Sequence, residues 1–444
     1  MLASVLLELA GEHPAVQKRL MRWQLAGQPD KLASAFRKTL AGWRRATRFL
    51  GYPEARAFGL ELEAWLAQIE KELMPSDPAA ALALAEAFLE ADAVFFDRAD
   101  DSDGSIGDAI RAGCRLWLNA AARCETPASE WPARLARLAE NDRYGAREEL
   151  LRCADLLLDE TALRQLVAHF EAKLDQVLAP GAGETALPTA VFSISGSLSL
   201  LGEALRDPAV HMRAVLRYSP EPNANQKESF VRSCLQFERP AEALPWLDGA
   251  WQHLEETRQR LHAEVLRQLG RRAESAQIQQ RLFEHSLAVS DLQTWLADLP
   301  EADRPGAIAQ ARTVALDHDD PAAAALVLIE IGADDEAESV LVAEPARVRG
   351  EDYVTLVPLA KALEGHHRRA GATVVYRALL TAILARAYAR AYGHAARYWA
   401  RLQAIAQEGG DLHPIEPHAA FEASMRSKHA RKASFWALVT RIVN

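Results

Sequence analysis

The sequence has little cysteine, and it lacks long uncharged apolar runs and alternating apolar–polar stretches. Four cysteines in 444 residues, Cys114, Cys124, Cys153 and Cys234, are too few and too scattered for a disulfide scaffold or a zinc ribbon. No stretch approaches the roughly 18 uncharged apolar residues of a membrane-spanning helix, so we expect no membrane association. Sparse β-branched residues and the scarcity of alternation argue against a β-sheet.

Catalytic motifs are also absent from the sequence. It contains no glycine-rich phosphate loop of the Walker or Rossmann type, no Gly-x-Ser-x-Gly elbow and no His-Glu-x-x-His motif. We therefore expect no cofactor, and the sequence favours a protein without enzymatic activity while leaving that question open. The first ten residues lack the basic segment of a secretory signal, so we expect a cytoplasmic protein.

Helical periodicity runs through the whole chain. Between Glu61 and Met74, for example, apolar residues recur at three- and four-residue spacing and form one stripe. Proline and glycine clusters separate such segments, which predicts about 17 to 20 helices in an all-α superhelix, or solenoid. The glycine-rich stretch 179–184 is the best candidate linker. We expect a helical domain over 1–178, a helical-repeat domain over 188–408, and a C-terminal extension with a docking helix over 409–444.

A faint repeat occupies the second half of the sequence. Helix-breaking turns are predicted near Arg239, Gly270, Pro300, Gly332 and Gly365, about 30 to 33 residues apart. This period is typical of tetratricopeptide-like helical hairpins, which stack because one hairpin cannot bury its own apolar face. Such stacks form concave surfaces that bind peptides and helices.

Charge is distributed unevenly. The chain carries a net charge of −10, but residues 12–56 carry +7 and residues 366–444 carry +8, which leaves −25 for the rest. The asymmetry indicates either an interaction surface or basic ends that complement an acidic middle.

The most informative basic segment is residues 373–406, for which the sequence predicts one long helix. On that helix Arg386, Arg390, Arg397 and Arg401 form a row, with His394 beside them. A row of guanidinium groups can bind phosphates or acidic side chains. The alternative is a solvated face, or arginines paired with carboxylates of a neighbouring helix.

The C-terminal tail combines cations with aromatic residues. Arg431 and Lys432 precede Phe435 and Trp436, a pattern that binds nucleic acid when the rings stack on bases. The alternative, which we favour, is that a final helix docks onto the repeats through Phe435, Trp436, Leu438 and Val439, while the cations face water.

Four residues are weak candidates for metal ligands. Asp101 and Asp103 lie in a loop that matches half of an EF-hand but lacks its first and last ligands. We favour a polar loop that caps the next helix or closes a turn. His413 and His418 lie four residues apart with no cysteine nearby, which is a poor zinc site. A cryptic hydrolase or metal site that uses these aspartates with His394 or His418 remains a third hypothesis.

Several stretches resemble a known family. They are Val94–Gly104, Asn141–Gly145, Tyr376–Leu380, Ala391–Tyr398 and His429–Trp436. Together they resemble an uncharacterised bacterial family of about this length, a domain of unknown function. Its last part is similar to the helical region of SWIM-type zinc-finger proteins, but this chain has no SWIM zinc ligands. The resemblance implies an all-helical repeat fold and no particular activity.

From these observations we expect a scaffold or adaptor that binds another protein or peptide. Nucleic-acid association through the arginine row and the tail is the second hypothesis. The oligomeric state is left open.

Overall fold

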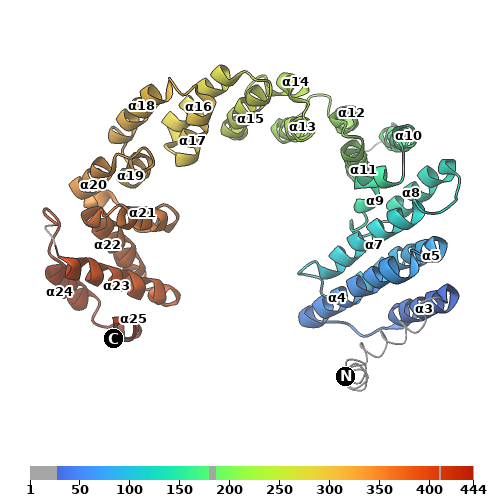
Figure 1. The fold of residues 1–444 in the computed structure, drawn as a ribbon, viewed down its shortest axis with the longest axis horizontal. Coiled ribbons are helices and arrows are strands. Elements are labelled where there is room, and N and C mark those ends of the chain that lie inside the picture. Colours follow the sequence, from blue (N-terminus) through green and yellow to red (C-terminus); the bar gives the residue numbers. More distant parts are fainter. Residues whose placement is uncertain (1–27, 180–186, 410–411, 444) are drawn as a thin grey trace. The chain divides into compact units, whose positions relative to one another are not determined.

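The computed structural model describes residues 28–179, 187–409 and 412–443, and all regular structure in them is helical (Figure 1). These residues contain 23 α-helices, α3 to α25, with short 3₁₀ and π segments between some of them. No β-strand occurs in the described part; a single isolated bridge joins Leu50 and Ala99. The predicted all-α class is confirmed. The predicted number of helices was too low because α6, α9 and α14 have only four or five residues each.

Contacts within the chain divide it into two compact units, residues 1–237 and 238–444. In each unit, helices pack mainly against their neighbours in the chain, as in an α-α solenoid. The predicted linker 179–184 lies outside the described residues except for Ala179. Helices α10 and α11, which flank it, pack against each other.

The described helices of unit 1 are α3 (Pro29–Arg45), α4 (Tyr52–Gln68), η1 (Ile69–Leu73), α5 (Pro78–Leu89), α6 (Asp92–Phe96), α7 (Ser105–Ala121), η2 (Ala128–Glu130), α8 (Trp131–Glu140), α9 (Glu149–Arg152), η3 (Ala154–Leu156), α10 (Glu160–Leu178), α11 (Thr189–Leu205), α12 (Pro208–Tyr218) and α13 (Ala224–Gln236).

The core of unit 1 follows the apolar stripes of the sequence. The stripe between Glu61 and Met74 is buried along α4 and the π-helical turn η1 that continues it. Its Trp65 makes an edge contact with Phe36 of α3 and stacks on Phe88 of α5. Helix α7 packs against both α4 and α5. Aromatic pairs of this kind contribute about 0.5–1.5 kcal/mol each beyond the burial of their area.

The described helices of unit 2 are α14 (Pro240–Ala243), η4 (Leu244–Leu247), η5 (Gln252–Leu254), α15 (Glu255–Gln268), α16 (Arg272–Ser286), α17 (Val289–Asp298), α18 (Arg304–Leu316), α19 (Pro321–Glu330), α20 (Asp334–Ala343), η6 (Pro345–Arg347), α21 (Tyr353–Gly365), α22 (Arg369–Ala385), η7 (Ala389–Ala391), α23 (Tyr392–Glu408), α24 (His418–Lys428) and α25 (Ala433–Val443).

All five predicted turns of the second half separate consecutive helices, from α13 and α14 to α21 and α22. Two of them place glycine in the left-handed region, Gly270 at φ +75° and Gly332 at φ +76°. The residue after each glycine donates its N–H to the carbonyl five positions back, Arg271 to Leu266 and Ala333 to Leu328. This Schellman geometry ends the helix and starts the next one, and glycine adopts it without steric cost.

The predicted single helix over 373–406 is wrong. Helix α22 ends at Ala385, Ala387 adopts a left-handed φ of +54°, and α23 begins at Tyr392 after the 3₁₀ turn η7. No proline or glycine marks the break. It lets α22 and α23 pack against each other, with buried residues such as Leu384 and Trp399 facing the core. Tertiary burial therefore overrides a local preference for a continuous helix.

Candidate protein-binding groove

The break between α22 and α23 opens a groove on the surface of unit 2. The groove encloses about 660 Å³. Its walls come from the first half of α21, the last half of α22, the connection through η7, and the first half of α23, elements that lie together in Figure 1. Most lining residues are apolar or aromatic, namely Tyr353, Val354, Val357, Pro358, Leu379, Ala382, Ile383, Tyr388, Ala391 and Tyr398; Gly350, Glu351, Arg386 and His394 complete the wall.

One end of the groove is held by a close backbone approach. The loop before α21 passes so near α22 that a Cβ atom at Gly350 would lie 2.0 Å from the carbonyl oxygen of Ala378 and 2.8 Å from the Cβ of Ala382. Only glycine fits there, since real Cβ atoms do not come so near a backbone oxygen. The loop and the helix are thus in direct contact at the groove.

Three large apolar side chains of the groove are mostly exposed to solvent. The exposed fractions are 68% for Tyr353, 69% for Val354 and 56% for Tyr388. Exposed apolar side chains that gather around a hollow are typical of binding surfaces. The sequence analysis missed these three residues. The sequence feature that could have indicated them is the pair Tyr353-Val354 directly after Asp352. Asp352 caps α21 by accepting the N–H of Thr355, so the pair lies in the first turn of that helix.

The structure distributes the predicted arginine row over three elements. Arg386 follows the last residue of α22 and lines the groove, and Arg390 lies in η7. Both side chains are exposed, and neither forms an ion pair within the described residues. Arg397 of α23 donates a hydrogen bond of 3.1 Å to Nδ1 of His394. Because arginine only donates, the imidazole of His394, which lines the groove, accepts at Nδ1.

Arg401 is also exposed, but unlike Arg386 and Arg390 it forms an ion pair. Its guanidinium lies 2.7 Å from the carboxylate of Glu364 at the end of α21. Burial, followed by the charge of Glu364, raises the pKa of the neighbouring Tyr376 hydroxyl to about 12. Arg401 is therefore paired with a carboxylate of a neighbouring helix, which is the alternative given above for the arginine row.

The aromatic residues of the tail pack into the core of unit 2. Phe435 is fully buried against Tyr392 and Trp399, and Val439 is buried on the next turn of α25. Trp436 makes an edge contact with Trp399, and the guanidinium of Arg426 covers its ring at 4.7 Å. Helix α25 therefore packs on α23 through these side chains. Arg431 remains exposed and Lys432 partly exposed, without a ring free to stack beside them.

The acidic loop before α7 caps that helix. Asp101 accepts the backbone N–H groups of Ile106 and Gly107, and Asp103 accepts both the backbone N–H and the side-chain O–H of Ser105. The hydrogen bonds from Ser105 lower the pKa of the Asp103 carboxyl. The carboxylates therefore satisfy the free N–H groups at a helix N-terminus, which is the capping alternative.

The two candidate histidines of unit 2 lie in different surroundings. His413 is exposed in the connection before α24, whereas His418, the first residue of α24, packs against Trp399 and Phe421. Throughout the described ranges, no three side chains of His, Cys, Asp or Glu gather closely enough to hold a metal ion.

We expect His418 to make unit 2 less stable in acid. Both ring nitrogens are buried without a hydrogen-bond partner. Burial, followed by the charge of Arg377, lowers the pKa of this imidazole below its ordinary value of 6.5. As the pH falls below that value, the unfolded chain takes up the proton first, so stability present at pH 7 is lost until the pH reaches the lower folded pKa.

Urea unfolding of unit 2 at pH 7.5 and pH 5 measures this effect, and His418→Phe is the matched variant, because it keeps a ring against Trp399. We expect the variant to reduce the loss of stability in acid. An unchanged loss in the variant assigns the pH dependence to other groups. Unit 1 of the same molecule serves as the internal control.

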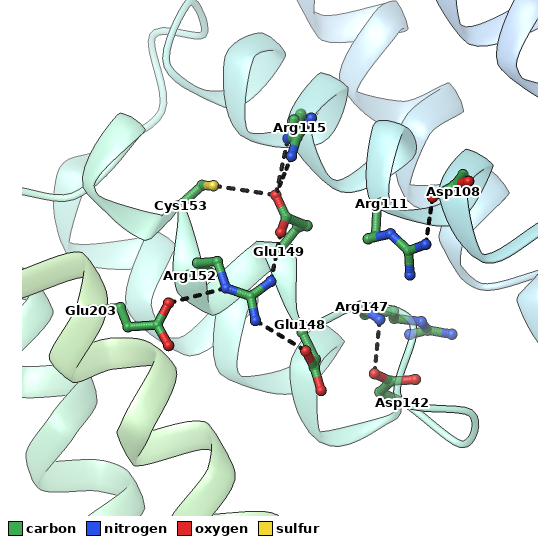
Figure 2. A network of polar contacts seen from close by, with 10 residues as sticks. All are labelled: Asp108, Arg111, Arg115, Asp142, Arg147, Glu148, Glu149, Arg152, Cys153 and Glu203. Carbon is green, nitrogen blue, oxygen red and sulfur yellow. Dashed lines mark hydrogen bonds and ion pairs between the residues drawn. The ribbon is translucent and has the colours of Figure 1, made fainter. Parts of the chain in front are cut away.

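Ionisable residues also converge in unit 1, where Figure 2 shows a network around α9. Glu149 accepts hydrogen bonds from Arg115 of α7 at 2.9 Å and from Arg152 at 2.7 Å, while Arg152 also donates to Glu203 of α11 at 3.1 Å. Burial raises the pKa of the Glu149 carboxyl, but the bonds from Arg152 and Arg115 outweigh it and keep the pKa low. Desolvation, followed by the charge of Glu149, raises the pKa of the adjacent Cys153 thiol.

This network links helices and contains no activated group. Its carboxylates are ion-paired, and Cys153 is a neutral thiol at physiological pH, whereas a nucleophilic cysteine requires a lowered pKa. No disulfide joins any of the four cysteines, all of which lie in the described residues. The network therefore stabilises the packing of α7, α9 and α11.

Fold and groove together define the class of this protein: an all-α protein of stacked helical hairpins with an apolar, arginine-edged surface groove. The chain belongs to a family of unknown function, DUF6880, whose model matches residues 1–191 and 228–438. No curated protein and no solved structure matches it. No helix of the described residues is long and apolar enough to cross a membrane.

Proposed function

We propose that this protein is a non-enzymatic scaffold or adaptor whose unit 2 binds a segment of another protein in the groove between α21, α22 and α23. The observation that carries the proposal is the exposure of Tyr353, Val354 and Tyr388 around an apolar hollow. Placing these side chains in contact with water is unfavourable by about 25 cal/mol per Å² of apolar area, and a bound segment removes that area from water.

The surrounding helices support a protein partner. Hairpins stacked along the chain offer an extended surface of rigid helices, which suits an extended peptide or a helix. We also propose that these hairpins are tetratricopeptide-like and that the C-terminal part is similar to the helical region of SWIM-type proteins. The proposal further includes a cytoplasmic location in a bacterial cell.

We expect Val354→Glu to weaken partner binding at least about tenfold, because it places a carboxylate where an apolar contact is made. Val354 is mostly exposed in the free protein, so the substitution leaves the fold intact. The partner is identified in the native host with a photo-crosslinking residue, Tyr388→p-benzoylphenylalanine. Binding is then measured with the purified partner by calorimetry.

Leu316→Glu is the matched control, because Leu316 of α18 is an exposed apolar residue of the same unit that does not line the groove. A crosslinked partner whose affinity falls with Val354→Glu and not with Leu316→Glu supports the proposal. Equal affinity for both variants and the unaltered protein excludes the groove as the binding site.

Nucleic-acid association is the second candidate function. It is favoured by Arg386, Arg390 and Arg431, exposed arginines without an ion pair in the described residues. Binding by these side chains should weaken steeply with salt, because each neutralised phosphate releases counterions. Absence of binding to DNA and RNA at about 50 mM salt removes this candidate.

A further inference from the structure

The unpaired cations at the groove point to the chemistry of its occupant. Building on the proposed function, we propose that the partner segment is acidic: a peptide or helix that places apolar side chains in the groove and Asp or Glu side chains against Arg386, Arg390 and Arg397.

The first observation is that these arginines belong to the minority of described arginines that form no ion pair with a carboxylate. Most arginines in the described ranges form ion pairs with carboxylates, as Arg401 does with Glu364. Arg386 and Arg390 form none there, and the described bond of Arg397 goes to His394, a neutral acceptor. The chain has ten more acidic than basic residues, so a shortage of carboxylates does not explain the exceptions.

The second observation is the charge balance at the groove. Glu351 is the one acidic residue among those that line it, against Arg386 on the wall and Arg390 and Arg397 nearby on η7 and α23. The groove side therefore carries a net positive charge beside an apolar surface. A carboxylate that docks here gains charge-assisted hydrogen bonds from guanidinium groups, and these are stronger where apolar contacts exclude water.

The third observation favours a polypeptide as the occupant. Pro358 lies inside α21 and lines the groove. Because proline has no N–H, Pro358 does not donate the usual helical hydrogen bond to the carbonyl of Val354, and its ring adds to the apolar wall. The groove thus combines an apolar wall with guanidinium donors. A peptide supplies both complements, apolar side chains and a carboxylate.

A single-stranded nucleic acid would use the arginines and the exposed rings of Tyr353 and Tyr388, but not the aliphatic wall of the groove. The wall includes the aliphatic side chains of Val357, Leu379 and Ile383, which offer no hydrogen bonds to base edges. The ring of Tyr398 already lies against Tyr376, with centroids 5.7 Å apart. The apolar wall therefore fits an amphipathic acidic segment better.

Two dyes that differ in one anionic group test the charge recognition on the full chain. 1-Anilinonaphthalene-8-sulfonate carries a sulfonate on an apolar ring system, and N-phenyl-1-naphthylamine is its neutral counterpart. We expect Arg386→Gln with Arg390→Gln to weaken binding of the anionic dye about fivefold and to leave the neutral dye unchanged. Arg304→Gln is the matched control: Arg304 is exposed in the same unit, has no ion pair in the described part, and does not line the groove.

Displacement of the anionic dye then tests the occupant. The probes are two 16-residue amphipathic peptides with leucine at the same positions and glutamate or lysine at all others, and a single-stranded 15-mer oligonucleotide. We expect the glutamate peptide to displace the dye at concentrations about fivefold lower than the lysine peptide, in line with paired charges.

The outcomes separate this inference from the proposed function. The inference of an acidic partner is wrong if both dyes bind but the double variant changes the affinity for neither. It is also wrong if the lysine peptide displaces the dye as well as the glutamate peptide does. In both cases the groove remains a binding site. Displacement by the oligonucleotide alone overturns the inference in favour of nucleic acid. If neither dye binds and Val354→Glu leaves the crosslinked partner's affinity unchanged, the proposed function fails as well.

Discussion

Replacing Asp92 with alanine is expected to lower the free energy of unfolding of unit 1 by about 3–5 kcal/mol. Asp92 of α6 and Arg147 are both buried, with exposed side-chain fractions of 2% and 4%. Two guanidinium nitrogens donate to the Asp92 carboxylate at 2.7 and 2.8 Å, and a third donates to the carbonyl of Leu138 at 3.0 Å. Removing the carboxylate leaves a buried positive charge without its counter-ion.

Two further variants identify the cause of this loss. Asp92→Leu combined with Arg147→Met removes both charges, and we expect it to recover most of the stability, because apolar replacements of a buried pair are often neutral. Glu160→Ala removes a carboxylate from an exposed pair with Arg164 and should cost far less stability than Asp92→Ala, because solvent screens exposed charges.

Hydrogen exchange with mass spectrometry in increasing urea follows unit 1 separately from unit 2. A loss below about 1 kcal/mol for Asp92→Ala would mean that water reaches Arg147 and that the pair contributes as a surface pair does.

Trp399→Ala is expected to destabilise unit 2 by about 3–5 kcal/mol, the usual cost of emptying a large aromatic site in a core. Trp399 of α23 is fully buried and contacts the rings of Phe421, Phe435 and Trp436. These rings belong to α24 and α25, so both helices lose a shared aromatic contact with α23. Amide exchange within residues 418–443 should accelerate more than exchange in α15 and α16.

Trp399→Phe is the matched variant. The indole Nε1 of Trp399 is buried without a hydrogen-bond partner, so phenylalanine keeps a ring in place and loses no hydrogen bond. We expect its cost to lie well below that of alanine. If exchange in α24 and α25 is unaffected by the alanine variant, these helices are not stabilised by Trp399.

Local patterns predicted much of the fold. The stripe between Glu61 and Met74 is buried as its three- and four-residue spacing predicted, since side chains four residues apart share a helix face. The turns at Gly270 and Gly332 could be predicted because a left-handed residue at a helix end favours glycine. The sequence also predicted that the last helix docks through Phe435, because Phe435 and Trp436 form an apolar pair next to the basic residues Arg431 and Lys432.

The candidate site was only partly predictable. Arg386 and His394 were chosen as members of one helical row, and both do line the groove, but Arg386 directly follows α22 whereas His394 lies in α23. The prediction of one continuous helix was wrong because residues 386–391 contain no proline or glycine that would indicate the break. Val354 and Tyr388 carried no periodic signal that distinguishes an exposed apolar residue from a buried one.

By itself, the sequence determined the helical class, most helix ends and the apolar faces, because these depend on interactions within about one helical turn. Only the tertiary structure decided the break after α22, the groove that it opens, the ion pair of Asp92 with Arg147 across 55 residues, and which arginines lack a carboxylate. Each of these features depends on which helix faces pack against each other. The packing of those faces is determined by the burial of the whole core, and the spacing of residues within one helix does not indicate it.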